Sequence, residues 1–314
     1  MIAVAELERA EEIPADRLRR QQRARWENYW SRSFIRIASP NREAEWLNAA
    51  YYVHLYTLGG TNRSPVPAKG DGFAGLMRGD ERRWGICEWV ETIRYTFMPL
   101  YASNRLEMVR SLCDFYTAMV PYLKAQTERL WDLPGLWIPE TVTPWGHAED
   151  WIIDEHPADE VNDIFWSWDP ETTPYGRFHH FNPYYGLLFT SGLVVCHYYL
   201  TYARYSGDEA FLHEHAYPVI RDVSLFVTSL LCKEDDGRYH LDPANAQETW
   251  WLVRDTEDTL IGLRAILPEF ILLSAQHPED GELVYFYYPL SRSGVLKEAT
   301  DIGRFQNEGS HVPS

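Results

Sequence analysis

The chain has few of the features that mark metal-binding, disulfide-linked or membrane proteins. It contains only four cysteines in 314 residues, and none of them forms a CxxC pair, which argues against a zinc site or a disulfide framework. No apolar run is long enough to span a bilayer, and residues 1–26 are charged and lack the apolar core of a signal peptide. We therefore expect a cytoplasmic protein as encoded, or a periplasmic or extracellular one if the chain is a fragment of a longer secreted protein.

Basic residues are scarce relative to acidic ones. Lys and Arg total 29 against 46 Asp and Glu, so the formal net charge is −17. Such a surface repels phosphate groups, which excludes nucleic acid and anionic membrane as expected partners. The acidic run 149–160 lacks the turn glycine of a calcium loop, and His213 and His215 lie two apart on a helix, where they point to different faces. We expect no metal ion and no cofactor.

Alternating strand patterns are also scarce, and the helical period dominates. Apolar positions recur at i, i+3 and i+4 in several stretches, which predicts an all-α fold. We expect helices over about 44–58, 87–102, 104–123, 187–205, 212–230 and 259–274. Gly207 is expected to end one helix in a left-handed conformation and Asp208 to cap the next. We treat 1–314 as a single domain, with a helical extension over 1–25 and an irregular tail over 282–314.

The connections between these helices are unusually long and aromatic. Residues 59–84 and 131–183 are rich in Gly, Pro and Trp, and aromatic residues make up 15% of the chain. Long loops in a compact domain are usually functional, and aromatic rings line sites for ligands with flat apolar faces such as sugars. We therefore expect an oligosaccharide or glycoside ligand, contacted by Asn62, Arg63 and His180 from loops.

One short stretch, residues 242–259, concentrates the chemistry. Glu248 stands beside Trp250 and Trp251, with Asn245 three residues before it. A Glu that aromatic rings partly desolvate has a raised pKa and keeps a proton for general acid catalysis. Asp258 follows at the start of a predicted helix, as a base, a sugar ligand or a simple helix-start carboxylate.

A second carboxylate candidate lies in one of the aromatic loops. Glu140, in the segment Gly135-Leu-Trp-Ile-Pro-Glu-Thr, sits among turn-forming and aromatic residues. A carboxylate in such a loop is a candidate for a perturbed pKa and a role in the site.

Several blocks, in their order and spacing, resemble the catalytic domain of glycoside hydrolase family 95. They are Trp84-Gly85 before a helix that ends Met98-Pro99-Leu-Tyr-Ala-Ser-Asn104, Gly207-Asp208 followed by Tyr217-Pro218, and the run Pro243-Ala-Asn-Ala-Gln-Glu-Thr-Trp-Trp. The resemblance covers roughly 26–274 and implies an (α/α)6 toroid with the sugar in a funnel at one end. It makes Trp84 a further candidate substrate-binding residue.

The resemblance also implies an inverting mechanism, in which an acid protonates the leaving oxygen and a base activates a water. Glu248 is similar in position to the family's proton donor. The family's two water-positioning Asn residues correspond here to Val90 and Thr92, with Glu88 and Glu91 nearby. We count about seven or eight helical segments where a complete toroid needs about twelve, so the toroid is expected to be partial.

Three functions remain open at this stage. The first is an inverting glycoside hydrolase, and the second is a non-catalytic glycan-binding remnant of one. The third is a class II terpene cyclase, because Asp255-Thr-Glu257-Asp258 approximates the acidic motif of those enzymes.

Overall fold

The computed structural model describes residues 13–62, 66–67, 88–143, 146–147, 187–246 and 250–292. Helices make up most of this part of the chain, which confirms the expected all-α fold. The helices of ten or more residues are α2 (Ala15–Trp30), α3 (Glu43–Thr61), α4 (Val90–Ala102), α5 (Leu106–Trp131), α9 (Thr190–Ser206), α11 (Tyr217–Ser229), α12 (Glu257–Leu273) and α13 (Gly281–Leu290). Shorter turns are α10 (Glu209–Phe211), a π-helix (Leu212–Ala216) and two 3-10 turns (Ser274–Gln276 and Pro278–Asp280).

The described strands are short and form three small antiparallel sheets. The first joins β1 (Glu88–Trp89), β2 (Thr141–Thr143) and β3 (Gly146–His147), the second β4 (Cys232–Lys233) and β5 (Tyr239–His240), and the third β6 (Ala244–Ala246) and β7 (Trp250–Val253). The first sheet connects the loop before α4 to the loop after α5. The third leads directly into α12. These two sheets therefore position the segments of the chain that precede α4 and α12.

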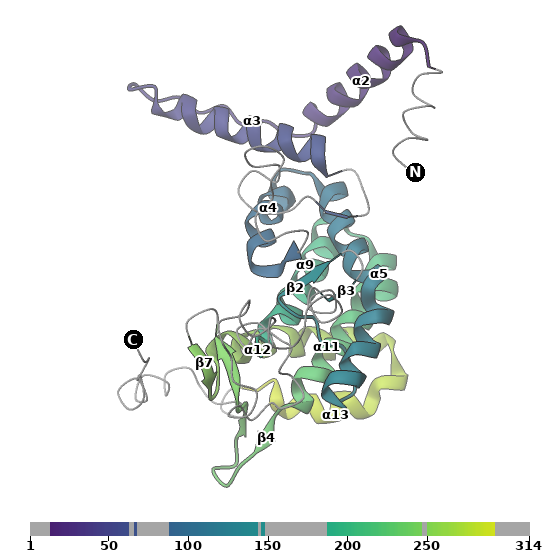
Figure 1. Cartoon of the computed structure of the whole chain (residues 1–314), viewed down its shortest axis with the longest axis vertical. Helices are drawn as coiled ribbons and strands as arrows, with labels where there is room; N and C mark the ends of the chain where they lie inside the picture. The colour runs from purple at the N-terminus through teal and green to yellow at the C-terminus, as the bar shows by residue number, and fades with distance from the viewer. Residues whose placement is uncertain are drawn as a thin grey trace, which may run out of the picture.

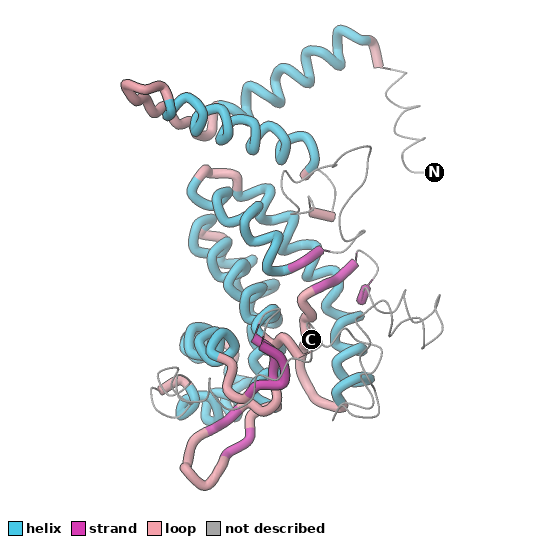
Figure 2. Tube along the Cα trace, turned by 60° about the vertical axis from the view of Figure 1, so that its left-hand side comes forward, coloured by secondary structure: helices cyan, strands magenta, loops and turns pink. Residues whose placement is uncertain are grey.

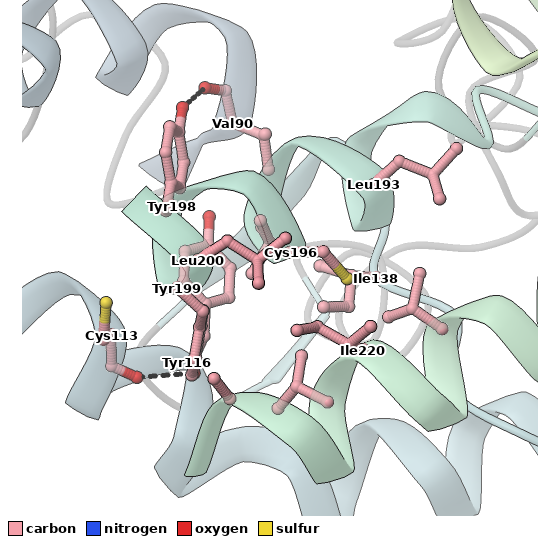
Figure 3. Close-up of a cluster of buried hydrophobic side chains, with 14 of the residues drawn as sticks. Val90, Cys113, Tyr116, Ile138, Leu193, Cys196, Tyr198, Tyr199, Leu200 and Ile220 are labelled. Carbon is pink, nitrogen blue, oxygen red and sulfur yellow. Dashed lines mark hydrogen bonds between the residues drawn. The ribbon is translucent and has the colours of Figure 1, made fainter. Parts of the chain in front are cut away.

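Helix α9 is the centre of the hydrophobic core. It packs against α4, α5, α11 and α12 (Figure 1), and its sequence is apolar nearly all round. Two of its tyrosines tie the neighbouring helices by hydrogen bonds. Tyr198 donates to the carbonyl of Val90 at 3.0 Å, and Tyr199 donates to the carbonyl of Cys113 at 2.7 Å (Figure 3). Both hydroxyl groups are therefore hydrogen-bonded although they are buried, and the rings fill the core.

Helices α4, α9 and α12 run parallel, with their N-termini at the same end. Gly262 near the start of α12 lies so close to Leu193 near the start of α9 that an added Cβ would come within 2.7 Å of a methyl carbon. The arrangement brings the first turns of three helices together at one end of the bundle.

Helix boundaries follow the expected signals at one well-defined junction. Gly207 ends α9 with a φ of +67°, and the Asp208 side chain accepts a hydrogen bond from the N–H of Phe211 at 2.9 Å. The following segment passes through the π-helix before Pro218 opens α11. Both the left-handed glycine and the capping aspartate are confirmed.

One expectation about the remaining chain needs correction. Part of the stretch predicted as an irregular tail, from Glu282 onward, is the helix α13, because Tyr287 and Leu290 bury themselves against the core. Only two side chains of its ten residues are buried, which leaves a weak periodic signal. Cys113 and Cys196 are buried in helices, and Cys232 is exposed in strand β4.

Helices α2 and α3 form an arm at one end of the molecule, clearly separate from the bundle in both views (Figures 1 and 2). Tyr29 of α2 donates a hydrogen bond to the carbonyl of Leu55 in α3 at 2.6 Å. The guanidinium of Arg105, at the start of α5, lies 4.3 Å from the centre of the Tyr29 ring. The first contact joins the two helices of the arm, and the second attaches the arm to the bundle. Within the described residues, no helix has the length and hydropathy needed to cross a membrane.

Gly135 holds the chain where it crosses α11, and its replacement tests this packing. Its φ is +97°, and an added Cβ would lie 2.4 Å from the carbonyl oxygen of Asp222. We expect Gly135→Ala to lower the free energy of unfolding by at least about 3 kcal/mol, measured by urea denaturation. Gly207→Ala is the matched control, because Gly207 is also left-handed but has open space around it, and should cost about 1 kcal/mol. Equal losses in the two variants would contradict the close approach.

Candidate active site

Acidic side chains gather where the first turns of α4, α9 and α12 meet. Glu91 stands in the first turn of α4, Asp258 in the first turn of α12, and Ser191 in the first turn of α9. Glu140 reaches the same place from the residue before β2. Helix N-termini carry partial positive charge and unpaired N–H groups, so they favour carboxylates. We call Glu91, Glu140, Ser191 and Asp258 the acidic cluster.

Glu140 is the fully buried member of this cluster. Its Oε1 accepts the N–H of Glu91 at 2.8 Å, and its Oε2 accepts the hydroxyl of Ser191 at 2.7 Å. Its backbone carbonyl also accepts the N–H of Val90 at 2.9 Å. Burial raises the pKa of the Glu140 carboxyl to about 8, although both hydrogen bonds act in the opposite direction. The side chain therefore caps α4, binds a side chain in the first turn of α9, and holds a proton at neutral pH.

Asp258 differs from Glu140 because its oxygens keep their acceptor capacity. Both carboxyl oxygens are buried from solvent, and neither has a hydrogen-bond partner of good geometry among the described residues. Burial raises the pKa of Asp258, the N–H of Thr259 and the hydroxyl of Thr256 oppose the rise, and the charge of Glu91 adds to it. A carboxylate with a raised pKa and unused lone pairs is a competent proton acceptor.

The surroundings of the acidic cluster add one cation and several buried polar groups. Arg94 forms an ion pair with Glu91 at 2.9 Å, one turn along α4. Glu88 is buried in β1. The hydroxyl of Tyr116 is buried too, and the pKa of that hydroxyl is raised by its burial and by the charges of Glu88 and Glu140. The site is thus strongly acidic, with a single ion pair to moderate it in the part of the chain that the structure describes.

The β6–β7 hairpin lies beside this end of the bundle. The N–H of Asn245 donates to the carbonyl of Leu187, just before α9, at 3.0 Å. The side-chain oxygen of Asn245 accepts the N–H of Leu252 at 2.8 Å across the hairpin. Leu252 has a φ of +54°, so this bond holds a backbone conformation that is rare for leucine. Asn245 therefore fixes the shape of the hairpin that carries Trp250 and Trp251.

The structure places the other predicted site residues as follows. Trp250 is half exposed in β7. Asn62 is buried at the end of α3, where its side chain donates to the carbonyl of Met108 at 3.2 Å and so joins α3 to α5. Glu248, Trp84, Arg63 and His180 lie outside the described residues, as does the side chain of Trp251. The described part brings Glu140, Asp258 and the Asn245 hairpin to one end of the bundle and leaves Asn62 in a structural contact elsewhere.

Sequence reasoning missed Ser191 and undervalued Glu91. Ser191 opens an apolar helix and bonds a residue 51 positions earlier in the chain, so no local pattern marks it. Glu91 was noted only as a neighbour of Val90 and Thr92. Its position two residues inside a helix start was the available signal.

His213 and His215 were expected to point to different faces of a helix and not to share a metal ion. His213 instead bonds His277 between ring nitrogens at 3.1 Å. Among the described residues, no group of three or more His, Cys, Asp or Glu side chains is arranged to hold a metal ion.

A comparison with models of protein families matches residues 95–268 to the glycosyl hydrolase family 95 catalytic domain. The chain belongs to glycosyl hydrolase family 95. The matched segment contains Glu140, Ser191 and Asp258 and runs from α4 into α12. The family is one of carbohydrate-active enzymes, which confirms the resemblance that the sequence blocks carried.

A search of solved structures finds the same kind of fold. One similar structure is a "Putative kojibiose phosphorylase from human microbiome", with a TM-score of 0.60 and 13% sequence identity. The alignment covers 86% of this chain and 31% of that one, so the present chain spans about a third of its neighbour's length. The likeness supports the expected all-α toroid, and the described helices are part of such a toroid. A comparison with curated proteins finds no similar sequence.

The raised pKa of Glu140 gives a testable pH dependence. The folded chain keeps this proton up to about pH 8, whereas the unfolded chain releases it near the ordinary value of 4.5. Between these values the folded state binds more protons than the unfolded state, so the free energy of unfolding falls as the pH rises. We expect Glu140→Gln to remove this fall, which is on the order of a few kcal/mol.

Urea denaturation of both proteins across this pH range measures the difference. Glu282→Gln is the control, because Glu282 is exposed on α13 and its loss should leave the pH profile of the parent protein unchanged. Parallel profiles for the parent and Glu140→Gln would contradict a buried, protonated Glu140.

Proposed function

We propose that the protein is an inverting glycoside hydrolase with Glu248 as its general acid. The observation that carries the proposal is the meeting of Glu91, Glu140 and Asp258 at the N-termini of three parallel helices in a family 95 domain. Glu248 stands in the sequence between β6 and β7, and this strand pair is bonded to the same end of the bundle through Asn245 and Leu187. Inverting hydrolysis needs two carboxyl groups about 6.5–9.5 Å apart with a water between sugar and base.

Asp258 is the proposed base. Its oxygens have no competing hydrogen-bond donor of good geometry in the described residues, and burial raises its pKa. Both properties favour removal of a proton from a water molecule. In this assignment Glu248 protonates the departing oxygen from the hairpin side, while the water that Asp258 activates attacks the opposite face of the ring.

Glu140 has a supporting role in this proposal. Its exposure is zero and both its oxygens are occupied by Glu91 and Ser191, so it does not reach the sugar. It holds the first turns of α4 and α9 together and so sets the distance between Glu91 and the rest of the site. Trp250, which is half exposed and stands two residues after Glu248 in the sequence, is proposed to stack on the sugar ring, together with Trp251.

A non-catalytic glycan-binding function is the second candidate, and one observation favours it. Val90 and Thr92 stand where the resemblance places two Asn residues. Val90 is fully buried and its carbonyl is used by Tyr198, so position 90 belongs to the core and cannot hold a water. Hydrolysis by this chain therefore requires that Glu91 or Asp258 position the water instead.

Substitution of Glu248 tests the general acid. We expect Glu248→Gln to lower kcat on an alkyl glycoside by about a hundredfold or more, since general acid catalysis is typically worth about 10²–10⁴. The loss should be much smaller on an aryl glycoside with a good leaving group, which needs little protonation. Steady-state kinetics on both substrates gives the comparison, with Glu282→Gln as the control that keeps parental rates.

The outcomes separate the candidates. Equal losses on the two substrates, with a normal circular dichroism spectrum, would show that Glu248 is not the proton donor. An unmodified chain that binds oligosaccharide but turns over neither substrate would favour the glycan-binding function.

A further inference from the structure

The outer face of α3 carries an apolar stripe that stays largely exposed in the described chain. Residues at steps of three or four along the helix are exposed and apolar or small, and we call them the α3 seam: Trp46, Ala49, Ala50, Val53, Tyr56 and Gly60. Trp46 is 80% exposed, Val53 51% and Tyr56 62%. This spacing places all six on one face over about four turns, as in the contact stripe of a coiled coil. Exposed apolar stripes of this length mark interaction surfaces.

The charges that flank the α3 seam are segregated. The first turn of α3 is acidic, with Glu43 and Glu45. Helix α2 is basic, with five arginines against two acidic residues, in a chain whose net charge is −17. It crosses α3 at the opposite end from the acidic turn, where Arg25 donates to the carbonyl of Gly59 at 2.6 Å and Trp26 stacks on Tyr56. The surface thus has an acidic end, an apolar middle and a basic end.

We propose that the α3 seam is the interface of a homodimer in which the two α3 helices pack antiparallel. A surface that joins to its own copy through a two-fold axis must be complementary to itself. Antiparallel pairing meets this requirement, because it sets the acidic turn of each copy against the basic α2 of the other. The macrodipoles of the two α3 helices then also run in opposite directions, so that the positive end of each lies beside the negative end of the other.

The sizes of the seam residues fit the same pairing. With Val53 at the two-fold axis, Trp46 of one copy lies opposite Gly60 of the other. An added Cβ on Gly60 would meet nothing within 4 Å, so the space beside it is open. The largest side chain of the seam therefore faces the residue with no side chain.

The acidic end of the α3 seam already holds one guanidinium group, because Arg42 pairs with Glu45 at 2.6 Å, and Glu43 and the ring of Trp46 stand beside it. An open pocket there is lined by Asn41, Arg42, Glu43, Glu45, Trp46 and Ala49. A tryptophan face with carboxylates beside it favours a guanidinium group. In the antiparallel dimer the arginines of the second copy's α2 reach this end of the seam. This inference is independent of the proposed function, since the α3 seam lies on the arm and not at the acidic cluster.

Sedimentation equilibrium of the full chain at micromolar concentrations tests the dimer. We expect a dimer for the parent chain and at least a roughly tenfold weaker association for Trp46→Glu. Val53→Glu should behave the same way, and both positions are exposed, so the fold should survive, as circular dichroism will show. Tyr285→Glu on α13 is the matched control: it also replaces an exposed aromatic residue, at 86% exposure, and should leave the dimer intact.

Gly60→Leu tests the antiparallel order specifically. Leucine favours a helix more than glycine does, so the monomer should be at least as stable, while the added side chain blocks the place of Trp46 and weakens association roughly tenfold. A parent chain that is monomeric throughout, or a dimer insensitive to Trp46→Glu and Val53→Glu, would overturn the proposal. A dimer broken by those variants but not by Gly60→Leu would overturn the antiparallel pairing.

Discussion

A carboxyl group removed from water must find hydrogen-bond donors or keep its proton, and Glu140 does both. Its oxygens take the N–H of Glu91 and the hydroxyl of Ser191, and burial raises its pKa to about 8. Because these donors belong to the first turns of α4 and α9, the two helices cannot slide past each other without leaving polar groups unpaired. The position of every other acidic group at this end depends on that constraint.

Close packing fixes α12 relative to α4 and α9 as well. Gly192 of α9 lies against Val223 of α11, and Gly262 of α12 lies against Leu193 of α9, at distances that leave no room for larger side chains. Tyr198 and Tyr199 then fix α9 to α4 and α5 through their hydroxyls. The packing of α12 thereby sets the position of Asp258, whose carboxyl meets the N–H of Thr259 and the hydroxyl of Thr256 but makes no hydrogen bond of good geometry among the described residues.

The sequence predicted what local patterns encode. Helical periodicity located α3, α5, α9 and α12, and the Gly207–Asp208 junction followed from the conformational freedom of glycine and the capping ability of aspartate. The sequence also marked Glu140 and Asp258 as carboxylates worth attention. It could not show that the hydroxyl of Ser191 binds the carboxyl group of Glu140, or that Asn62 joins α3 to α5. Both contacts link residues more than 40 positions apart. It also missed α13, whose buried residues are too few to produce a clear period.

The charge of the site bears on which molecule attacks the sugar. The fold neighbour is named as a phosphorylase, an enzyme class in which phosphate takes the place of water. Among the described residues, Arg94 is the cation beside Glu91, and it is already paired with that carboxylate, so phosphate would meet negative charge from Glu91 and Asp258. Repulsion between like charges is strong where water is excluded, since the local dielectric is low. A neutral water has no such barrier, and a nearby carboxylate with a raised pKa activates it. The charge of the acidic cluster, in the part of the chain that the structure describes, thus supports the hydrolysis that we propose over phosphorolysis.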